Sequence, residues 1–215
     1  MAKDVKELDF RKVEVSGHVQ ELVANPSAIG LFGLAMVTLV ASSQKLGWTA
    51  GVAGVIPWAI FLGALAQLVA GIMDFKHNNT FGATAFCAYG FFWFGVAMTW
   101  MTTLGQFGAQ AASTYAPHQL GFAFLGYFIF TVIMTFASMG TNKVLFIIFF
   151  LIDLLFLGLF MSVLTDQPHG FWHSLAAWSE LMISIFSFYG VAANVMNATY
   201  KKVVLPVGKT FGPWV

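Results

Sequence analysis

The sequence predicts an all-α, polytopic membrane protein with six transmembrane helices. Composition, long apolar segments and the placement of lysine and arginine all support this fold class. Hydrophobic residues make up 59% of the 215 positions and charged residues 9%, and the mean hydropathy is +0.79, whereas a soluble domain carries about 25% charged residues. One core of this size cannot bury so much apolar surface, so we expect a lipid bilayer to solvate the rest. The net charge of +1 gives no reason to expect a nucleic-acid partner.

Six apolar segments are long enough to cross a membrane, which takes about 20 mostly apolar residues. They cover residues 26–44, 51–73, 81–104, 119–137, 144–164 and 171–197, with turn formers or charges between them. A transmembrane barrel would instead show alternating segments of about ten residues. We therefore expect a six-helix domain at 25–200, between an N-terminal tail at 1–24 and a C-terminal tail at 201–215.

The lysines and arginines indicate an orientation. With six spans, all of them except Lys45 fall on one side of the membrane, together with both chain ends. The positive-inside rule then places both tails in the cytoplasm, and we expect the cell membrane as the location. Adding or removing one span would scatter the same charges over both sides, so the charge pattern supports six spans independently.

A helix-start signal precedes the first span. Asn25 can cap a helix, and Pro26 suits the first helical position. Thr80 and Asn142 stand at the starts of the third and fifth spans, which lie on the same side. Three helix starts would offer free N–H groups to an anion, although ordinary capping also explains Thr80 and Asn142. No lysine or arginine lies within a span, so we expect an anion to meet dipoles and neutral donors instead of a fixed cation.

Small residues in the second span indicate a helix contact. Ala59, Gly63, Gln67 and Gly71 recur every four residues and form one stripe, which lets another backbone approach closely. Gln67 interrupts this stripe with a polar side chain. It can bond to a neighbouring helix or face a water-filled path.

Two acids interrupt the last two apolar spans. Asp153 and Glu180 lie at similar distances from the turn near Asp166, so antiparallel helices would place them at similar depth. A carboxylate at mid-bilayer costs roughly 2.5–3.5 kcal/mol on insertion scales, so such a group usually has a partner or a purpose. We hypothesise that the two acids form a pair that takes up a proton with the substrate. The alternative is that they are neutral acids that bond between helices or protomers.

We expect neither a metal nor a cofactor. The histidines lie in the tail, in loops or at span ends. His169 and His173 have helical i, i+4 spacing, and Asp166 and Glu180 lie in the same region, but no cysteine lies nearby, and two histidines bind a metal only if other ligands join them. The polar segments contain no nucleophile–base pair and no phosphate-binding loop, so we do not expect an enzyme.

Several motifs, in order along the chain, resemble the acetate uptake transporter family of the succinate-acetate permease type. They are Asn25-Pro26 with Gly30-Leu31, Ala66-Gln67 through Gly71, Asn79-Thr80-Phe81-Gly82, Thr84-Ala85-Phe86 with Tyr89-Gly90, and Val204-Leu205-Pro206-Val207-Gly208. The resemblance extends from Asn25 to Gly208.

This resemblance implies a homohexamer in which each protomer has its own path for acetate and related short carboxylates, with succinate as a candidate. It also implies an apolar constriction formed by Leu34, Tyr89 and either Ile152 or Leu151. Such a ring stops ions by dewetting, while the tyrosine hydroxyl offers a hydrogen bond.

The candidate substrate-binding residues are Asn25, Pro26, Gly30, Leu31, Gln67 and Thr80. The alternative functions are a channel for small neutral solutes and a membrane-embedded enzyme or assembly subunit without a transport path. The sequence does not distinguish a channel from a proton symporter.

Overall fold

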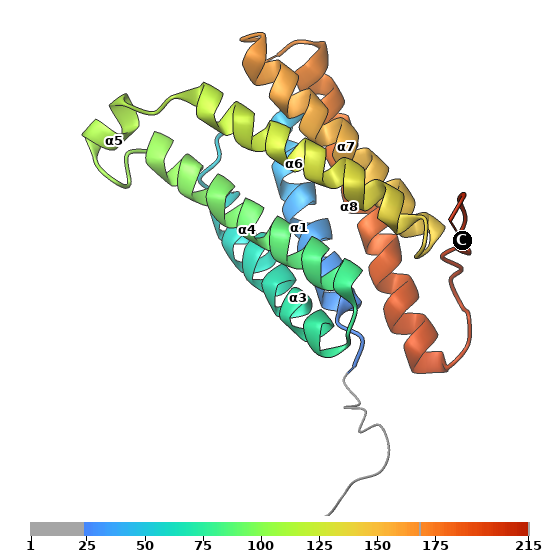
Figure 1. The fold of residues 1–215 in the computed structure, drawn as a ribbon. Coiled ribbons are helices and arrows are strands. Elements are labelled where there is room, and N and C mark those ends of the chain that lie inside the picture. The colour runs from blue at the N-terminus through green and yellow to red at the C-terminus, as the bar shows by residue number, and fades with distance from the viewer. Residues whose placement is uncertain (1–23, 168, 215) are drawn as a thin grey trace, which may run out of the picture.

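The computed structural model describes residues 24–167 and 169–214, and every regular element in these ranges is helical. Six helical spans are long and apolar enough to cross a membrane, which confirms the predicted number (Figure 1). They are α1 (Ser27–Lys45), the second span (Ile56–Lys76), α4 (Thr80–Thr103), α6 (Pro117–Ser138), α7 (Lys143–Leu164) and α8 (Phe171–Tyr200). The predicted N-terminal tail lies almost wholly outside the described residues.

The second span is not a uniform α-helix. It consists of α2 (Ile56–Trp58), the π-helix η1 (Ala59–Ala66) and α3 (Gln67–Lys76). It begins five residues later than the predicted 51–73, because Gly51 has a φ of 74°, outside the helical region. π-Helical turns are rare and often occur at functional sites. Here the π-helix ends directly before Gln67, the polar residue of the predicted stripe.

A short helix that the sequence did not predict, α5 (Ala109–Ser113), lies in the connection between α4 and α6. Figure 1 shows it at the tip of this connection.

The spans pack in a ring. α1 packs against α8 and against the second span, α8 packs against α7, and α7 packs against α6. The second span packs against α4, whose contact with α6 is smaller and completes the ring. α1, α4 and α7 come from different parts of this ring and together line the cavity described below.

Close backbone approach holds the second span against α4, as the small-residue stripe predicted. Ala59, Gly63, Gln67 and Gly71 are all buried. A Cβ atom added to Gly63 would lie 2.7 Å from Cγ of Trp93, and one added to Gly71 would lie 2.9 Å from the backbone nitrogen of Cys87. Both positions therefore need a residue without a side chain.

The C-terminal segment 201–214 folds back over the turn between α6 and α7 (Figure 1). Val144 N–H donates to the Val207 carbonyl at 3.2 Å, and Phe211 N–H donates to the Met139 carbonyl at 3.0 Å. The first bond satisfies a free N–H group in the first turn of α7.

We predict that Gly71→Ala lowers the stability of the protein by about 1–3 kcal/mol, because the new methyl group would press against the α4 backbone. Gly95→Ala is the matched control, since a Cβ atom there would meet nothing within 4 Å. The thermal midpoint of detergent-solubilised protein, followed by size-exclusion chromatography, checks the difference. Equal midpoints for the two variants would contradict the close packing.

Candidate substrate path

A cavity of about 160 Å³ opens between α1, α4 and α7 at the end of the bundle where α1 begins. We call it the Leu34 cavity. Its lining is mostly apolar and includes Leu31, Leu34, Phe81, Ala85, Phe86, Tyr89, Leu145, Ile148, Phe149 and Ile152. Its polar lining residues are Ser27, Gln67, Asn79 and Thr141.

Three helix starts converge on this cavity. Ser27, Gly82 and Leu145 lie in the first turns of α1, α4 and α7, and all three residues line it. First-turn N–H groups lack partners within their own helix and carry the positive end of the helix dipole. The positive ends of three helix dipoles therefore point toward the cavity, and none of the described residues that line it is charged.

The caps of these helices differ in part from the prediction. Asn25 Oδ1 accepts from the Ser27 N–H at 2.9 Å, so Asn25 caps α1, but Pro26 precedes the helix instead of opening it. Asn79, not Thr80, caps α4, because its Oδ1 accepts from the Gly82 N–H at 3.2 Å while Thr80 is exposed. Asn142 caps α7 as expected, accepting from the Leu145 N–H at 3.0 Å.

Asn25 faces a second, smaller cavity beside the first. This cavity, of about 140 Å³, is also lined by Asn142, Asn194 and Val207, and it shares Ser27 and Leu31 with the Leu34 cavity. Asn25 Nδ2 donates to Asn194 Oδ1 at 3.3 Å, which joins the start of α1 to α8. Asn25 is thus at the mouth of the Leu34 cavity and does not line it.

The structure brings together three of the four constriction candidates. Leu34, Tyr89 and Ile152 are buried and line the Leu34 cavity. Leu151 is only partly buried and is not among the lining residues, so the register of α7 favours Ile152. The Tyr89 hydroxyl lies 2.8 Å from Thr131 Oγ1 on α6, which positions the ring.

Two of the candidate binding residues contribute by packing. Pro26 is buried where α1 begins. Gly30 is also buried, and a Cβ atom there would lie 2.6 Å from Cζ of Phe86. Gly30 therefore lets an aromatic ring of α4 approach α1 and form a cavity wall.

Gln67 is fully buried and lines the Leu34 cavity. Its Nε2 donates to the carbonyl of Gly63 in the same span at 2.7 Å, and its Oε1 has no partner among the described residues. The expected bond to a neighbouring helix is therefore absent in the described part of the chain. Gln67 thus faces the Leu34 cavity and bonds only within its own span.

A second large cavity lies on the other side of the constriction. It has a volume of about 170 Å³, and Lys45, Glu180 and His173 line it together with Gln44 and apolar residues. We call it the Lys45 cavity. Phe92 and Leu155 line it, and each lies three residues, or about one helical turn, beyond Tyr89 and Ile152 of the Leu34 cavity.

An aromatic barrier separates the two cavities. The Phe156 side chain is 1% exposed. Its ring stacks on Tyr89 with centroids 6.4 Å apart and meets Phe92 edge-on at 5.0 Å. Packed aromatic side chains thus lie between the Leu34 cavity and the Lys45 cavity.

Asp153 and Glu180 do not form the predicted pair. Asp153 Oδ2 accepts from Thr135 Oγ1 of α6 at 2.7 Å, whereas Glu180 Oε2 lies 2.9 Å from Lys45 Nζ of α1. Counting residues along the chain gives the depth of each acid in the membrane but not the direction in which its side chain points. The two helices direct these acids toward different neighbours. The pairing hypothesis is therefore wrong, although each acid has one partner on a neighbouring helix.

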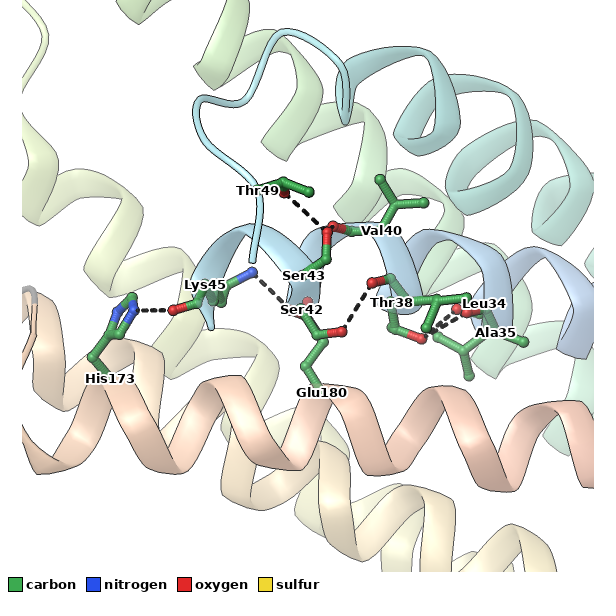
Figure 2. A network of polar contacts seen from close by, with 11 residues as sticks. Leu34, Ala35, Thr38, Val40, Ser42, Ser43, Lys45, Thr49, His173 and Glu180 are labelled. Atoms are coloured by element: carbon green, nitrogen blue, oxygen red, sulfur yellow. Dashed lines mark hydrogen bonds and ion pairs between the residues drawn. The ribbon is translucent and has the colours of Figure 1, made fainter. Parts of the chain in front are cut away.

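The Lys45–Glu180 ion pair also corrects the expectation that no fixed cation meets the path. Lys45 ends α1, yet its side chain is only 12% exposed, and that of Glu180 is 2% exposed. Figure 2 shows this pair between α1 and α8, with His173 Nε2 3.1 Å from the Lys45 carbonyl oxygen. The sequence position of Lys45 indicates a loop between the first two spans. In the structure its long side chain turns back from the helix end and reaches Glu180.

Sequence reasoning missed Asp74, which is 1% exposed near the end of α3. Asn79 Nδ2 donates to its Oδ1 at 3.0 Å, while its Oδ2 has no partner among the described residues. Asn79 therefore caps α4 and also donates a hydrogen bond to the buried Asp74 carboxyl group. The signal in the sequence is the turn from Asp74 to Asn79 between the second and third spans, where an acid precedes a cap-type asparagine by five residues.

These features define an integral, multi-pass membrane protein with two cavities separated by an aromatic layer. Residues 11–210 match the model of the GPR1/FUN34/yaaH family, and the chain belongs to this family.

Similar proteins carry names that refer to transport. The succinate-acetate/proton symporter SatP of Escherichia coli strain K12 is 33% identical over 190 residues, which cover 87% of this chain and 97% of that protein. Acetate permease A of Emericella nidulans is 30% identical over 204 residues, covering 89% of this chain and 67% of the permease. The solved structure of the bacterial acetate channel SatP matches with a TM-score of 0.80 and 28% identity, over 87% of this chain and all of that chain.

We predict that Asn79→Ala lowers the free energy of unfolding by about 1–3 kcal/mol, because it removes the α4 cap and the donor to Asp74. Thr80→Ala should change it little, since the Thr80 side chain is exposed. Unfolding by sodium dodecyl sulfate, followed by circular dichroism, measures both variants. A larger loss for Thr80→Ala would contradict the assignment of the cap.

Proposed function

We propose that this chain is a membrane transport protein for acetate and related short carboxylates, with succinate as a candidate substrate, and that it has no catalytic role. One observation carries the proposal, namely the convergence of the starts of α1, α4 and α7 on the Leu34 cavity. The names of the relatives support the same substrate class.

The cavity matches the two parts of a short carboxylate. The hydroxyl of Ser27 offers a donor to the carboxylate at the mouth, and the positive ends of the three helix dipoles favour its charge. Leu34, Phe86 and Ile152 offer apolar surface to the alkyl part. Binding without a full cation is weak, and a transport path needs weak binding so that the substrate can leave.

Among the other candidate binding residues, Leu31 and Gln67 line the cavity directly. We propose that the unpartnered Oε1 of Gln67 accepts a hydrogen bond from a water molecule or from the hydroxyl group of an undissociated acid in the path. Asn25 and Thr80 act at most at the mouth, whereas Pro26 and Gly30 shape it.

We also propose the orientation and assembly. With the start of α1 facing the cytoplasm, only Lys45 among the lysines and arginines belongs to the outer half of the bundle. The protein then lies in the cell membrane with both ends cytoplasmic, and the Lys45 cavity faces outward. The family resemblance supports a homohexamer, and exposed apolar residues such as Phe122 and Ile133 on α6 suit contact with lipid or with another protomer.

Uptake of labelled acetate into proteoliposomes tests the proposed function. The protein should raise uptake above that of empty liposomes, and unlabelled acetate or succinate should compete. A channel for small neutral solutes, the alternative function, would ignore added acetate. Uptake equal to that of empty liposomes would exclude acetate as a substrate.

We predict that Ile152→Ala raises the uptake of butyrate relative to acetate several-fold, because it removes side-chain volume at the constriction. Leu151→Ala is the matched control, because its side chain does not line the cavity. A milder variant, Ile152→Val, should give an intermediate ratio at a cost of about 0.5–1.5 kcal/mol in stability. If folded Ile152→Ala protein keeps the wild-type ratio of butyrate to acetate uptake, Ile152 does not form the constriction.

Asp153 and Glu180 remain the proposed proton sites, now as two separate sites instead of a pair. Asp153 lies near the middle of α7, and its Oδ1 is buried without a partner among the described residues. A carboxyl group placed there is readily held in its neutral form, so it can take up and release a proton.

We predict that Asp153→Asn reduces the stimulation of acetate uptake by an inward proton gradient, because asparagine still accepts from Thr135 but binds no proton. Combining it with Glu180→Gln should abolish the stimulation. Uptake with and without a dissipated gradient provides the measurement. If the double variant keeps the wild-type dependence on the gradient, neither acid carries the proton.

A further inference from the structure

The Lys45–Glu180 ion pair is built into a cavity wall instead of the outer surface. Lys45 Nζ and Glu180 Oε2 are 2.9 Å apart, and both residues line the Lys45 cavity. The cavity lies on the path about one helical turn beyond the constriction, at Phe92 and Leu155. A substrate that passes the constriction must therefore pass this pair.

The partner that Lys45 already holds has the chemistry of the proposed substrate. Glu180 presents a carboxylate on an alkyl stem, and a short carboxylate ion offers the same two oxygens to the ammonium group. A purely structural ion pair could lie in a packed wall, but this one faces a cavity of about 170 Å³. A free carboxylate can therefore approach Lys45 and compete with Glu180.

Few other charged or titratable groups face this pair. On α8 itself, His173 lines the same cavity, and its Nε2 contacts the Lys45 carbonyl oxygen at 3.1 Å. On α7, which also packs against α8, Asp153 is turned toward Thr135 of α6. Asp166, in the turn before α8, is exposed and lies 3.8 Å from His118. Among the described residues that line the cavity, Lys45 is therefore the only lysine or arginine.

We propose that Lys45 is a second binding position for the substrate carboxylate, and that Glu180 holds the Lys45 ammonium group when no substrate is present. This inference rests on the proposed function and adds a site beyond the Leu34 cavity. Substrate and Glu180 exchange places on Lys45, so the cation never traps the anion. Because the Glu180 carboxylate competes for Lys45, the path can contain a full cation and still bind its substrate weakly.

The exchange also links binding to protons. A proton that moves from water onto the Glu180 carboxylate cancels its charge and weakens its hold on Lys45. Lys45 is then free to bind a substrate carboxylate. The half-saturation concentration for acetate should therefore fall as the pH in the Lys45 cavity falls.

Kinetics in proteoliposomes test the exchange through three variants. Glu180→Gln should lower the half-saturation concentration for acetate, on the order of five- to tenfold, and should flatten its dependence on pH. Lys45→Gln should raise it by a similar factor. Lys45→Gln combined with Glu180→Gln replaces the ion pair by two neutral amides and should behave as Lys45→Gln does.

Two control variants distinguish carboxylate binding by Lys45 from the general effect of removing a positive charge or destabilising the fold. Lys76→Gln removes an exposed lysine from the last turn of α3, at the opposite end of the bundle, and should leave the half-saturation concentration unchanged. His173→Gln should keep the wild-type pH dependence. Thermal midpoints in detergent identify any variant that fails to fold, and the neutral double variant then supplies the comparison.

The outcomes are distinct. A wild-type protein that gives no uptake above empty liposomes would overturn the proposed function, and the exchange site with it. Wild-type uptake, together with a folded double variant whose half-saturation concentration and pH profile equal those of the wild type, would overturn the exchange site alone. Such a result would make the pair a structural link between α1 and α8.

Discussion

The structure depends on one constraint, which is that a chain in lipid must satisfy its backbone hydrogen bonds internally. Helices achieve this everywhere except at their ends, where the first N–H groups remain free. Asn25, Asn79 and Asn142 each satisfy one such group with a side-chain oxygen at the start of α1, α4 and α7. The starts of all three helices lie around one small cavity. The same constraint that makes the spans helical thus directs the positive ends of three helix dipoles toward the place where we propose that an anion enters.

Close packing leaves two cavities with an aromatic layer between them. Gly71 lets the α4 backbone approach closely, whereas Gly30 and Gly63 make room for the rings of Phe86 and Trp93. Phe156 and Tyr89 form the layer between the two cavities. Aromatic rings suit this position because they exclude water and can open a gap by a change of rotamer. On the proposed path, such a layer stops ions without a charged barrier.

The sequence predicted the parts of the fold that follow from periodicity and composition. The six spans and the close approach at Gly63 and Gly71 were correct, because lipid demands long apolar helices and small residues at contacts. The π-helix before Gln67 was not predictable, since a one-residue widening leaves no clear signature in an apolar run. The partners of Asp153 and Glu180 were missed because depth can be counted along a chain, whereas rotation about a helix axis depends on how all six spans pack.

The C-terminal segment has a consequence for how the protein is made. Val207 lines the same small cavity as Asn25 and Asn194, and its carbonyl accepts the Val144 N–H at the start of α7. The mouth is therefore assembled from residues far apart in the sequence. During synthesis, five spans can enter the bilayer while this mouth is still incomplete. It is completed only after Val207 has left the ribosome and the segment that follows α8 has folded back onto the start of α7.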